Sequence, residues 1–114
     1  MKKYVDSKYI EIEHVGDILR EEFMEPLDIS MNALAAGIGV PTNRIHGIVH
    51  RTRGITADTD LRLTKFFGLS QGYFLRLQEH YDMLIASREI KDEIDAIIPF
   101  DYKSRDSGTR RPHA

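Results

Sequence analysis

The segment that most constrains the fold of this chain is residues 30–50, where two short patterns of helical period meet at a glycine. Two helices that cross steeply need a small residue where their backbones approach, which Ala35 supplies, and a residue that tolerates a positive φ at the bend, which Gly39 supplies. Ser30 can cap the first helix through its hydroxyl, and Pro41 suits the first turn of the second. The apolar positions that would hold this pair against a domain are Leu34, Ile38, Val40, Ile45 and Ile48. The segment predicts a helix-turn-helix, and a plain helical hairpin is the alternative.

The rest of the chain predicts an all-α fold, a compact bundle of five to six helices. Residues 9–13 alternate apolar and acidic side chains, which favours an extended segment or short strand. Helical spacing runs from His14 to about Glu25, and then over 30–38, 41–50 and 57–67, the last capped by Thr56 and closed by Gly68. Ser70 is expected to cap a fifth helix, whose stripe would pack on the core through Phe74, Leu77, Tyr81, Leu84 and Ile85.

Length and composition place the chain among small single-domain proteins. Its 114 residues fit one domain with short tails: an extended segment over 1–13, a helix-turn-helix domain with a C-terminal amphipathic helix over 14–98, and a disordered tail over 99–114. No apolar run approaches the roughly 20 residues that span a bilayer, and the start lacks the apolar region of a signal peptide. We therefore expect a cytoplasmic protein without membrane contact. The absence of cysteine excludes disulfides and thiolate metal sites.

Charge is segregated along the chain, although its net value is only −2. Acidic residues crowd positions 11–28, where Arg20 is the only base, whereas positions 29–57 hold no acid and carry Arg44, Arg51 and Arg53. The second window is the surface expected to face phosphates. An ordinary solvated helix face is the alternative interpretation.

The helix predicted over 41–50 divides into two faces. If Ile45, Ile48 and Val49 point inward, the 3.6-residue period turns the remaining positions outward wholly or in part. These are Thr42, Asn43, Arg44, His46, Gly47 and His50. In a helix-turn-helix the N-terminal half of the second helix enters the major groove of DNA, so Thr42, Asn43 and Arg44 are best placed for base edges.

The side chains suit particular contacts to DNA. Asn43 could pair with adenine N6 and N7, Arg44 with a guanine edge or a phosphate, and the Thr42 methyl with thymine. Gly47 would permit close backbone approach. The remaining candidates are expected to hold phosphates, namely Arg51, Arg53 and the N–H groups near Ser30.

Other chemistries find little support in the residues. His46 and His50 are four apart, but no third metal ligand lies nearby in sequence. Glu79, His80 and Asp82 lack the cleft that acid–base catalysis needs, and no glycine-rich phosphate loop or nucleophile motif exists, so we expect neither an enzyme nor a cofactor. The aromatic side chains at helical spacing are expected in the core, namely Phe66, Phe67, Tyr73, Phe74 and Tyr81.

Three further segments, residues 14–23, 53–63 and 70–82, together with the helix-turn-helix, resemble the HigA-type (VapI-like) antitoxins of bacterial toxin–antitoxin operons, a branch of the Cro/cI-type (XRE) repressors. The resemblance covers about residues 14–98. It implies a lambda-repressor-like domain that dimerises, binds a palindrome in its own promoter and neutralises an mRNA-cleaving toxin of the HigB type. The chain departs from the family at Val15, where proline is usual, and at Tyr73-Phe74, where Phe-Trp is common.

Two alternatives to the antitoxin share much of this evidence. A free-standing XRE-type regulator without a toxin partner would use the same DNA-contacting residues, and a protein-interaction module would use none of them. A stripe of Ile90, Ile94, Ile97 and Ile98, ended by Pro99, has three interpretations: packing on its own domain, a dimer seam or a toxin-docking face. We favour packing within the chain, with some contribution to a dimer.

Overall fold

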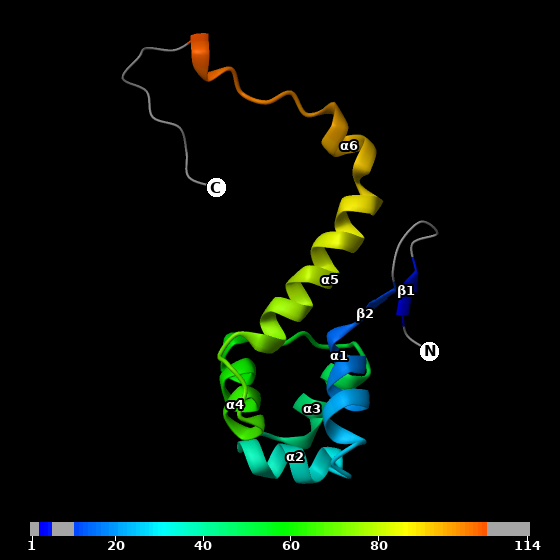
Figure 1. Ribbon diagram of the computed structural model, residues 1–114, viewed down its shortest axis with the longest axis vertical. Helices are drawn as coiled ribbons and strands as arrows, with labels where there is room; N and C mark the ends of the chain where they lie inside the picture. The colour runs from blue at the N-terminus through cyan, green and yellow to red at the C-terminus, as the bar shows by residue number, and fades with distance from the viewer. Residues whose placement is uncertain (1–2, 6–10, 105–114) are drawn as a thin grey trace.

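The computed structural model describes residues 3–5 and 11–104. Its elements follow in chain order: β1 (Lys3–Val5), β2 (Glu11–Glu13), α1 (Val15–Ile18), the π-helical turn η1 (Leu19–Met24), α2 (Met31–Ile38), α3 (Thr42–Val49), α4 (Ala57–Phe67), α5 (Tyr73–Glu89), α6 (Lys91–Ala96) and the 3₁₀ turn η2 (Tyr102–Ser104). The all-α prediction is confirmed, with one small addition, since β1 and β2 pair antiparallel with Lys3 opposite Glu13. Residues 11–81, which we call the body, carry the packed helices, and residues 82–104, which we call the arm, lead away from them (Figure 1).

The first helical segment begins where the sequence predicts. His14 is its N-cap, because the Nδ1 atom of His14 accepts the N–H of Gly16 at 2.9 Å. The segment then widens into the π-helical turn and ends at Met24, within two residues of the expected Glu25 and Pro26. Sequence period alone did not predict the π-helical turn.

The helix-turn-helix forms as expected over α2 and α3. Ser30 Oγ accepts the N–H of Ala33 at 3.0 Å, Ala35 is buried, and Gly39 ends α2 in the left-handed region with φ 75°. Pro41 corrects one detail of the prediction: it is the N-cap of α3 and not part of its first turn, with an extended ψ of 148°. The residue before Thr42 therefore sets the entry angle of α3 by its fixed φ.

The ends of α4 also follow local sequence. Thr56 Oγ accepts the N–H of Thr59 at 3.3 Å, and Gly68 closes the helix with φ 72°. Both residues have the role that the sequence predicts, because caps depend on residues only a few positions away.

The start of α5 contradicts the prediction for Ser70. The N-cap is Gly72, with φ 88°, and it has no side-chain cap of its own. The buried carboxylate of Asp60 from α4 accepts the N–H groups of Gly72 at 2.6 Å, Phe74 at 2.9 Å and Leu75 at 3.1 Å. Ser70 is not needed as a cap because a residue ten positions earlier satisfies these orphan donors.

The core of the body lies between α1 with η1, α2, α3, α4 and the start of α5. The larger side chains with essentially no exposure are Leu19, Leu34, Ile45, Ile48, Leu63 and Phe74. Burial of each such side chain stabilises the fold by about 1.5–3 kcal/mol. Phe23 lies between Phe67 and Phe74, with ring centroids 5.0 and 5.3 Å away.

Two of the expected core aromatics lie at the edge. Phe66 is exposed and covers Gly37, where an added Cβ would lie 2.6 Å from the ring. Tyr81 is half-buried against the His14 ring, with centroids 5.1 Å apart. The expectation that the whole aromatic set is core is therefore wrong for Phe66, because helix α4 turns that position toward solvent.

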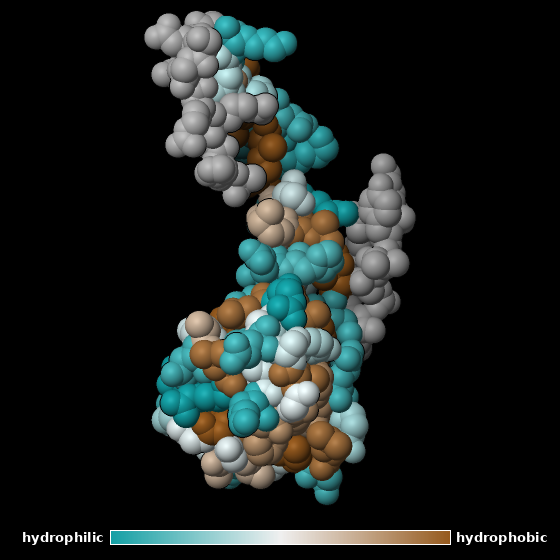
Figure 2. Space-filling view, turned by 60° about the vertical axis from the view of Figure 1, so that its left-hand side comes forward, coloured by the Kyte–Doolittle hydropathy of each residue, from teal (hydrophilic) through white to brown (hydrophobic). Residues whose placement is uncertain are grey.

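The arm has no core of its own. No side chain described over residues 82–103 is buried, and Ile97 and Ile98 are 68% and 88% exposed. Figure 2 shows brown, apolar surface along this part of the molecule. The expected packing of the isoleucine stripe on its own domain is wrong, because α5 carries α6 beyond the body (Figure 1). The tail expected over 99–114 lies largely outside the described residues, as do residues 6–10 of the N-terminal segment.

Candidate nucleic-acid interface

The two faces of α3 differ sharply. Ile45 and Ile48 are fully buried and Val49 nearly so, while Thr42, Asn43, His46 and His50 are exposed. The predicted facing of this helix is therefore correct for its apolar residues and for most of its polar ones. A short helix anchored by isoleucines presents a row of polar side chains to solvent.

Gly47 does not lie on this exposed face. It is buried, and its carbonyl accepts the N–H groups of Thr52 at 2.9 Å and Arg53 at 3.1 Å. An added Cβ would lie 3.0 Å from the Cβ of Arg53. The expectation that Gly47 faces outward is wrong: the glycine allows the turn after α3 to fold back against the helix.

His46 and His50 form a stacked pair on the exposed face. Their ring centroids are 3.9 Å apart with an interplanar angle of 20°, and His50 Nδ1 lies 3.0 Å from the carbonyl oxygen of His46. Within residues 3–5 and 11–104 no group of three or more potential ligands is arranged to hold a metal ion. The pair thus adds two flat polar rings to the surface beside Asn43.

Arg44 is the half-buried member of the first turn of α3. Its Nη1 atom donates to Asp58 Oδ1 at 2.9 Å, across to the first turn of α4. The hydrogen bond from Arg62 lowers the pKa of Asp58 most, and the bond and charge of Arg44 lower it further. A surface recess of about 390 Å³ adjoins this pair, lined by Arg44, Arg53, Gly54, Thr56, Asp58 and Thr59.

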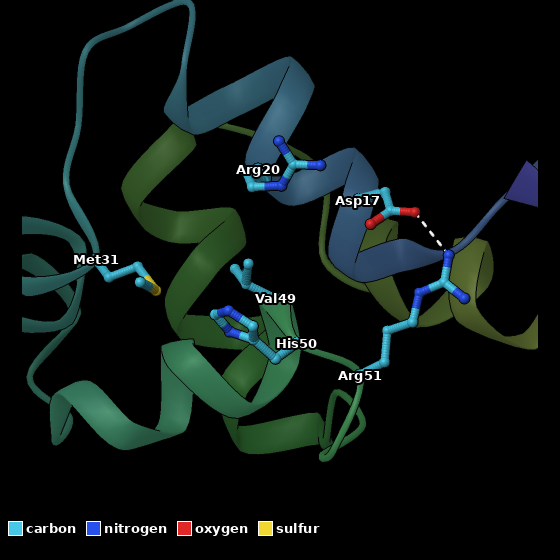
Figure 3. Close-up of a pocket in the computed structure, with 6 residues that line it drawn as sticks. All are labelled: Asp17, Arg20, Met31, Val49, His50 and Arg51. Carbon is cyan, nitrogen blue, oxygen red and sulfur yellow. Dashed lines mark hydrogen bonds and ion pairs between the residues drawn. The ribbon is translucent and has the colours of Figure 1, made fainter. Parts of the chain in front are cut away.

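Arg51, expected to hold a phosphate, forms an ion pair inside the chain. Its Nη2 atom donates to Asp17 Oδ2 at 2.8 Å, and the Asp17 side chain is only 3% exposed (Figure 3). Arg51 also has a positive φ of 66°, within the turn that follows α3. The pair lies at a recess of about 380 Å³ lined by Asp17, Arg20, Met31, Val49, His50 and Arg51.

Ser30 and Arg53 lie where the sequence predicts. Ser30 is exposed at the N-terminus of α2, with its hydroxyl used as the cap, and Arg53 is exposed beyond α3. The exit loop is fixed from the far side by Gln78 of α5, whose Oε1 accepts the N–H of Ile55 at 2.6 Å and whose Nε2 donates to its carbonyl at 2.9 Å.

Sequence reasoning missed three residues that position this interface: Asp17, Asp60 and Gln78. Their partners lie 34, 12–15 and 23 positions away in the chain. No local pattern connects residues so far apart. The sequence gives one indication of such residues: a polar side chain at a position whose helical period points inward needs a hydrogen-bond partner in the interior.

The fold and this surface define a helix-turn-helix domain with an exposed polar helix beside exposed arginines. None of the described helices is long and apolar enough to cross a membrane.

Comparison with known proteins narrows the class to a family. No protein-family model matches the chain. Virulence-associated protein I of Dichelobacter nodosus is 44% identical over 92 residues, which are 81% of this chain and 84% of that protein. An addiction module antidote protein of the HigA family from Coxiella burnetii has a TM-score of 0.70 and 41% identity, covering 76% of this chain and 96% of that one. The antitoxin HigA of Pseudomonas aeruginosa, solved with the higBA promoter, has the same TM-score and 37% identity over 75% and 95% of the two chains. The chain belongs to the HigA family of antitoxins.

Proposed function

We propose that this chain is the antitoxin of a HigBA-type module and a sequence-specific repressor of its own operon. Its family membership and the resemblance to a HigA solved with its promoter support the proposal. The observation that carries it is the division of α3, which buries Ile45 and Ile48 while exposing Thr42 and Asn43 at its N-terminal end. That end of the second helix is the part that enters the major groove.

Each exposed residue has a role in this proposal. Thr42 and Asn43 contact base edges, with the amide of Asn43 suited to adenine. His46 and His50 lie next along the helix and are candidates for further base or sugar contacts. Ser30, through the N–H groups at the start of α2, and the exposed Arg53 contact phosphates. Arg51, which is paired with Asp17, is a further candidate for a phosphate contact.

The test compares two DNA duplexes: the region directly upstream of the gene for this chain, and a scrambled duplex of equal length and composition. We expect preference for the first and a steep loss of affinity with salt, with a logarithmic slope of about −0.9 for each phosphate neutralised. Thr42→Ala and Asn43→Ala should each reduce the discrimination by about 1–3 kcal/mol while melting like the wild type.

Gln71→Ala is the matched control, because this exposed amide lies in the turn before α5 and outside the interface. It should leave both affinities unchanged. If Asn43→Ala weakens both duplexes equally, Asn43 contacts the backbone and not the bases. If wild-type binding is equal on both duplexes and insensitive to salt, the chain is not a repressor.

The proposal also includes two protein partners. We infer a toxin of the HigB type that cleaves mRNA, which is what the resemblance to HigA antitoxins implies. The second partner is another copy of this chain, because one eight-residue helix contacts few base pairs, whereas a dimer meets two half-sites about one helical turn apart. The exposed isoleucines of the arm supply apolar surface for such contacts.

Co-expression with the neighbouring gene tests the toxin. We expect a small neighbouring gene product that arrests growth alone, that does not do so with this chain, and that forms a complex with it. A chain that binds its upstream DNA but has no such neighbour would instead be a free-standing XRE-type regulator.

A further inference from the structure

One carboxylate connects α3 to the corner of the helix-turn-helix. The Oδ1 atom of Asp58 accepts hydrogen bonds from Arg44 Nη1 at 2.9 Å and from Arg62 Nε at 2.7 Å. Arg62 Nη1 in turn donates to the carbonyl oxygens of Ile38 at 2.8 Å and Gly39 at 3.4 Å. A chain of hydrogen bonds therefore runs from the end of α2, through the first two turns of α4, to the first turn of α3.

This chain of bonds fixes Arg44 at the end of α3 that faces DNA in the proposed function. Arg62 is held by two backbone carbonyls that are themselves fixed by the left-handed Gly39. Arg62 forms one ion pair with Asp58, and Arg44 forms another with the same carboxylate oxygen. Arg44 is less exposed than Asp58, with side-chain exposures of 30% and 58%. The arginine is therefore restrained by an anchor outside its own helix.

The pairing changes what Arg44 can offer to DNA. A guanidinium without a partner is attracted to every phosphate, whatever the base sequence. Asp58, which Arg44 shares with Arg62, offsets part of the charge of Arg44, yet a guanidinium has five N–H donors, and the bond to Asp58 uses one nitrogen. A directed contact to a guanine edge is thus retained, while the general attraction to the backbone is reduced.

We propose that Asp58 is a specificity-determining residue, which restrains Arg44 and offsets part of its charge, and so lowers the affinity of this chain for DNA of unrelated sequence. The inference rests on the proposed operator binding. Asp58 is a positioning residue, since it acts through Arg44 and not through a base.

The surroundings of Asp58 favour this role over an ordinary surface ion pair. It is the first acid after the acid-free stretch of residues 29–57, and it lines the same recess as Arg44 and Arg53. A carboxylate at this place opposes the approach of phosphates. Repulsion of phosphates and the partial offset of the Arg44 charge both act against sequence-independent binding.

The experiment measures Asp58→Asn on the upstream and scrambled duplexes over a series of salt concentrations. Affinity for the scrambled duplex should rise about two- to fivefold, as expected for an exposed charge. The salt slope on that duplex should steepen by about 0.9, which corresponds to one further phosphate. Affinity for the upstream duplex should rise less or fall, so that the ratio of the two decreases.

A second background tests whether Asp58 acts through Arg44. In Arg44→Ala, the gain caused by Asp58→Asn should fall to less than half its size, because the partner is already absent. An equal gain in both backgrounds overturns the proposal and leaves Asp58 as a simple repulsive charge. No change in the ratio with Asp58→Asn also overturns it.

Controls separate this inference from fold and from function. Asp95→Asn removes another exposed carboxylate, paired with Lys91 on α6, and should change neither affinity. Asp58→Ser, which keeps a residue suited to the first turn of a helix, should repeat the result if the asparagine variant melts early. If the wild type shows no preference for the upstream duplex, the proposed function fails, whereas a wild-type preference that Asp58→Asn does not alter refutes this inference alone.

Discussion

The body and the arm are both built from amphipathic helices, but they use their apolar side chains differently. In the body, Ile45 and Ile48 have no exposed surface. In the arm, Ile94 is 44% and Ile98 is 88% exposed, although the spacing of the isoleucines is equally regular. Helical period thus indicates that a segment has an apolar face, and it does not indicate which surface covers that face.

The apolar side chains of the arm stay exposed because no other helix of the described residues packs against the end of α5 or against α6. The first turns of α5 pack against α1 and α4, whereas α5 continues past them and α6 is only six residues long (Figure 1). A helix of that length is marginal in water without a packing surface. The body is therefore expected to be stable by itself, and the arm is expected to gain stability from another molecule.

The largest effect is expected from a substitution that leaves a cavity in the core of the body. Ile45→Ala should reduce the free energy of unfolding by about 2–5 kcal/mol, because the side chain is fully buried. Urea unfolding measures the loss. Leu27→Ala is the control, since Leu27 is apolar but exposed, and it should cost less than about 0.5 kcal/mol. Equal effects of the two changes would show that the core is not where the structure has it.

A buried polar contact should have the next largest effect. Asp60→Ala leaves three backbone N–H groups at the start of α5 without their acceptor, which should cost about 1–3 kcal/mol. Thermal or urea unfolding checks the value. Ser70→Ala is the matched control, because Ser70 is the cap that local sequence favours, and it should be nearly neutral. A larger loss for Ser70→Ala would reverse the assignment of the cap.

The pH dependence of the body should have a smaller contribution from His14. Burial lowers the pKa of His14 most, and the charge of Arg51 lowers it further, against the opposing effect of Asp17 and Asp82. The folded state therefore favours the neutral ring, whose Nδ1 accepts the N–H of Gly16. The contribution of neutral His14 is present above its ordinary pKa of 6.5 and is lost as the pH falls through the lowered folded-state value.

His14→Asn tests this dependence, because asparagine keeps a cap acceptor that does not titrate. Its unfolding free energy should fall less between neutral and mildly acidic pH than that of the wild type. His80→Asn removes an exposed histidine on α5 and should leave the wild-type dependence intact. Identical pH profiles for His14→Asn and the wild type would show that His14 does not contribute to the pH dependence of stability.

The smallest effect on the body is expected from the arm itself. Ile94→Ser with Ile98→Ser should change the unfolding free energy of the monomer by less than about 0.5 kcal/mol, since neither side chain is buried. The same variant should weaken self-association, measured by sedimentation over a range of protein concentrations. A large loss of stability at the lowest concentration would mean that the arm folds back on the body.

Much of the body was predictable because its determinants are local. The cap residues Ser30 and Thr56 and the left-handed glycines Gly39 and Gly68 act on backbone groups within a few positions of themselves. The facing of α3 follows from the same short-range period. Gly47 is the exception, since it is buried by the turn that follows α3.

The sequence by itself determined where α2 and α4 begin and end and which side of α3 is apolar, because those properties depend on neighbouring residues. Only the tertiary structure decided that Asp60 caps α5, that Arg51 pairs with Asp17, and that Asp58 restrains Arg44. It also decided that the isoleucines of the arm stay exposed. These outcomes depend on which segments meet in space, because each hydrogen bond or covered face joins residues that are far apart in the chain.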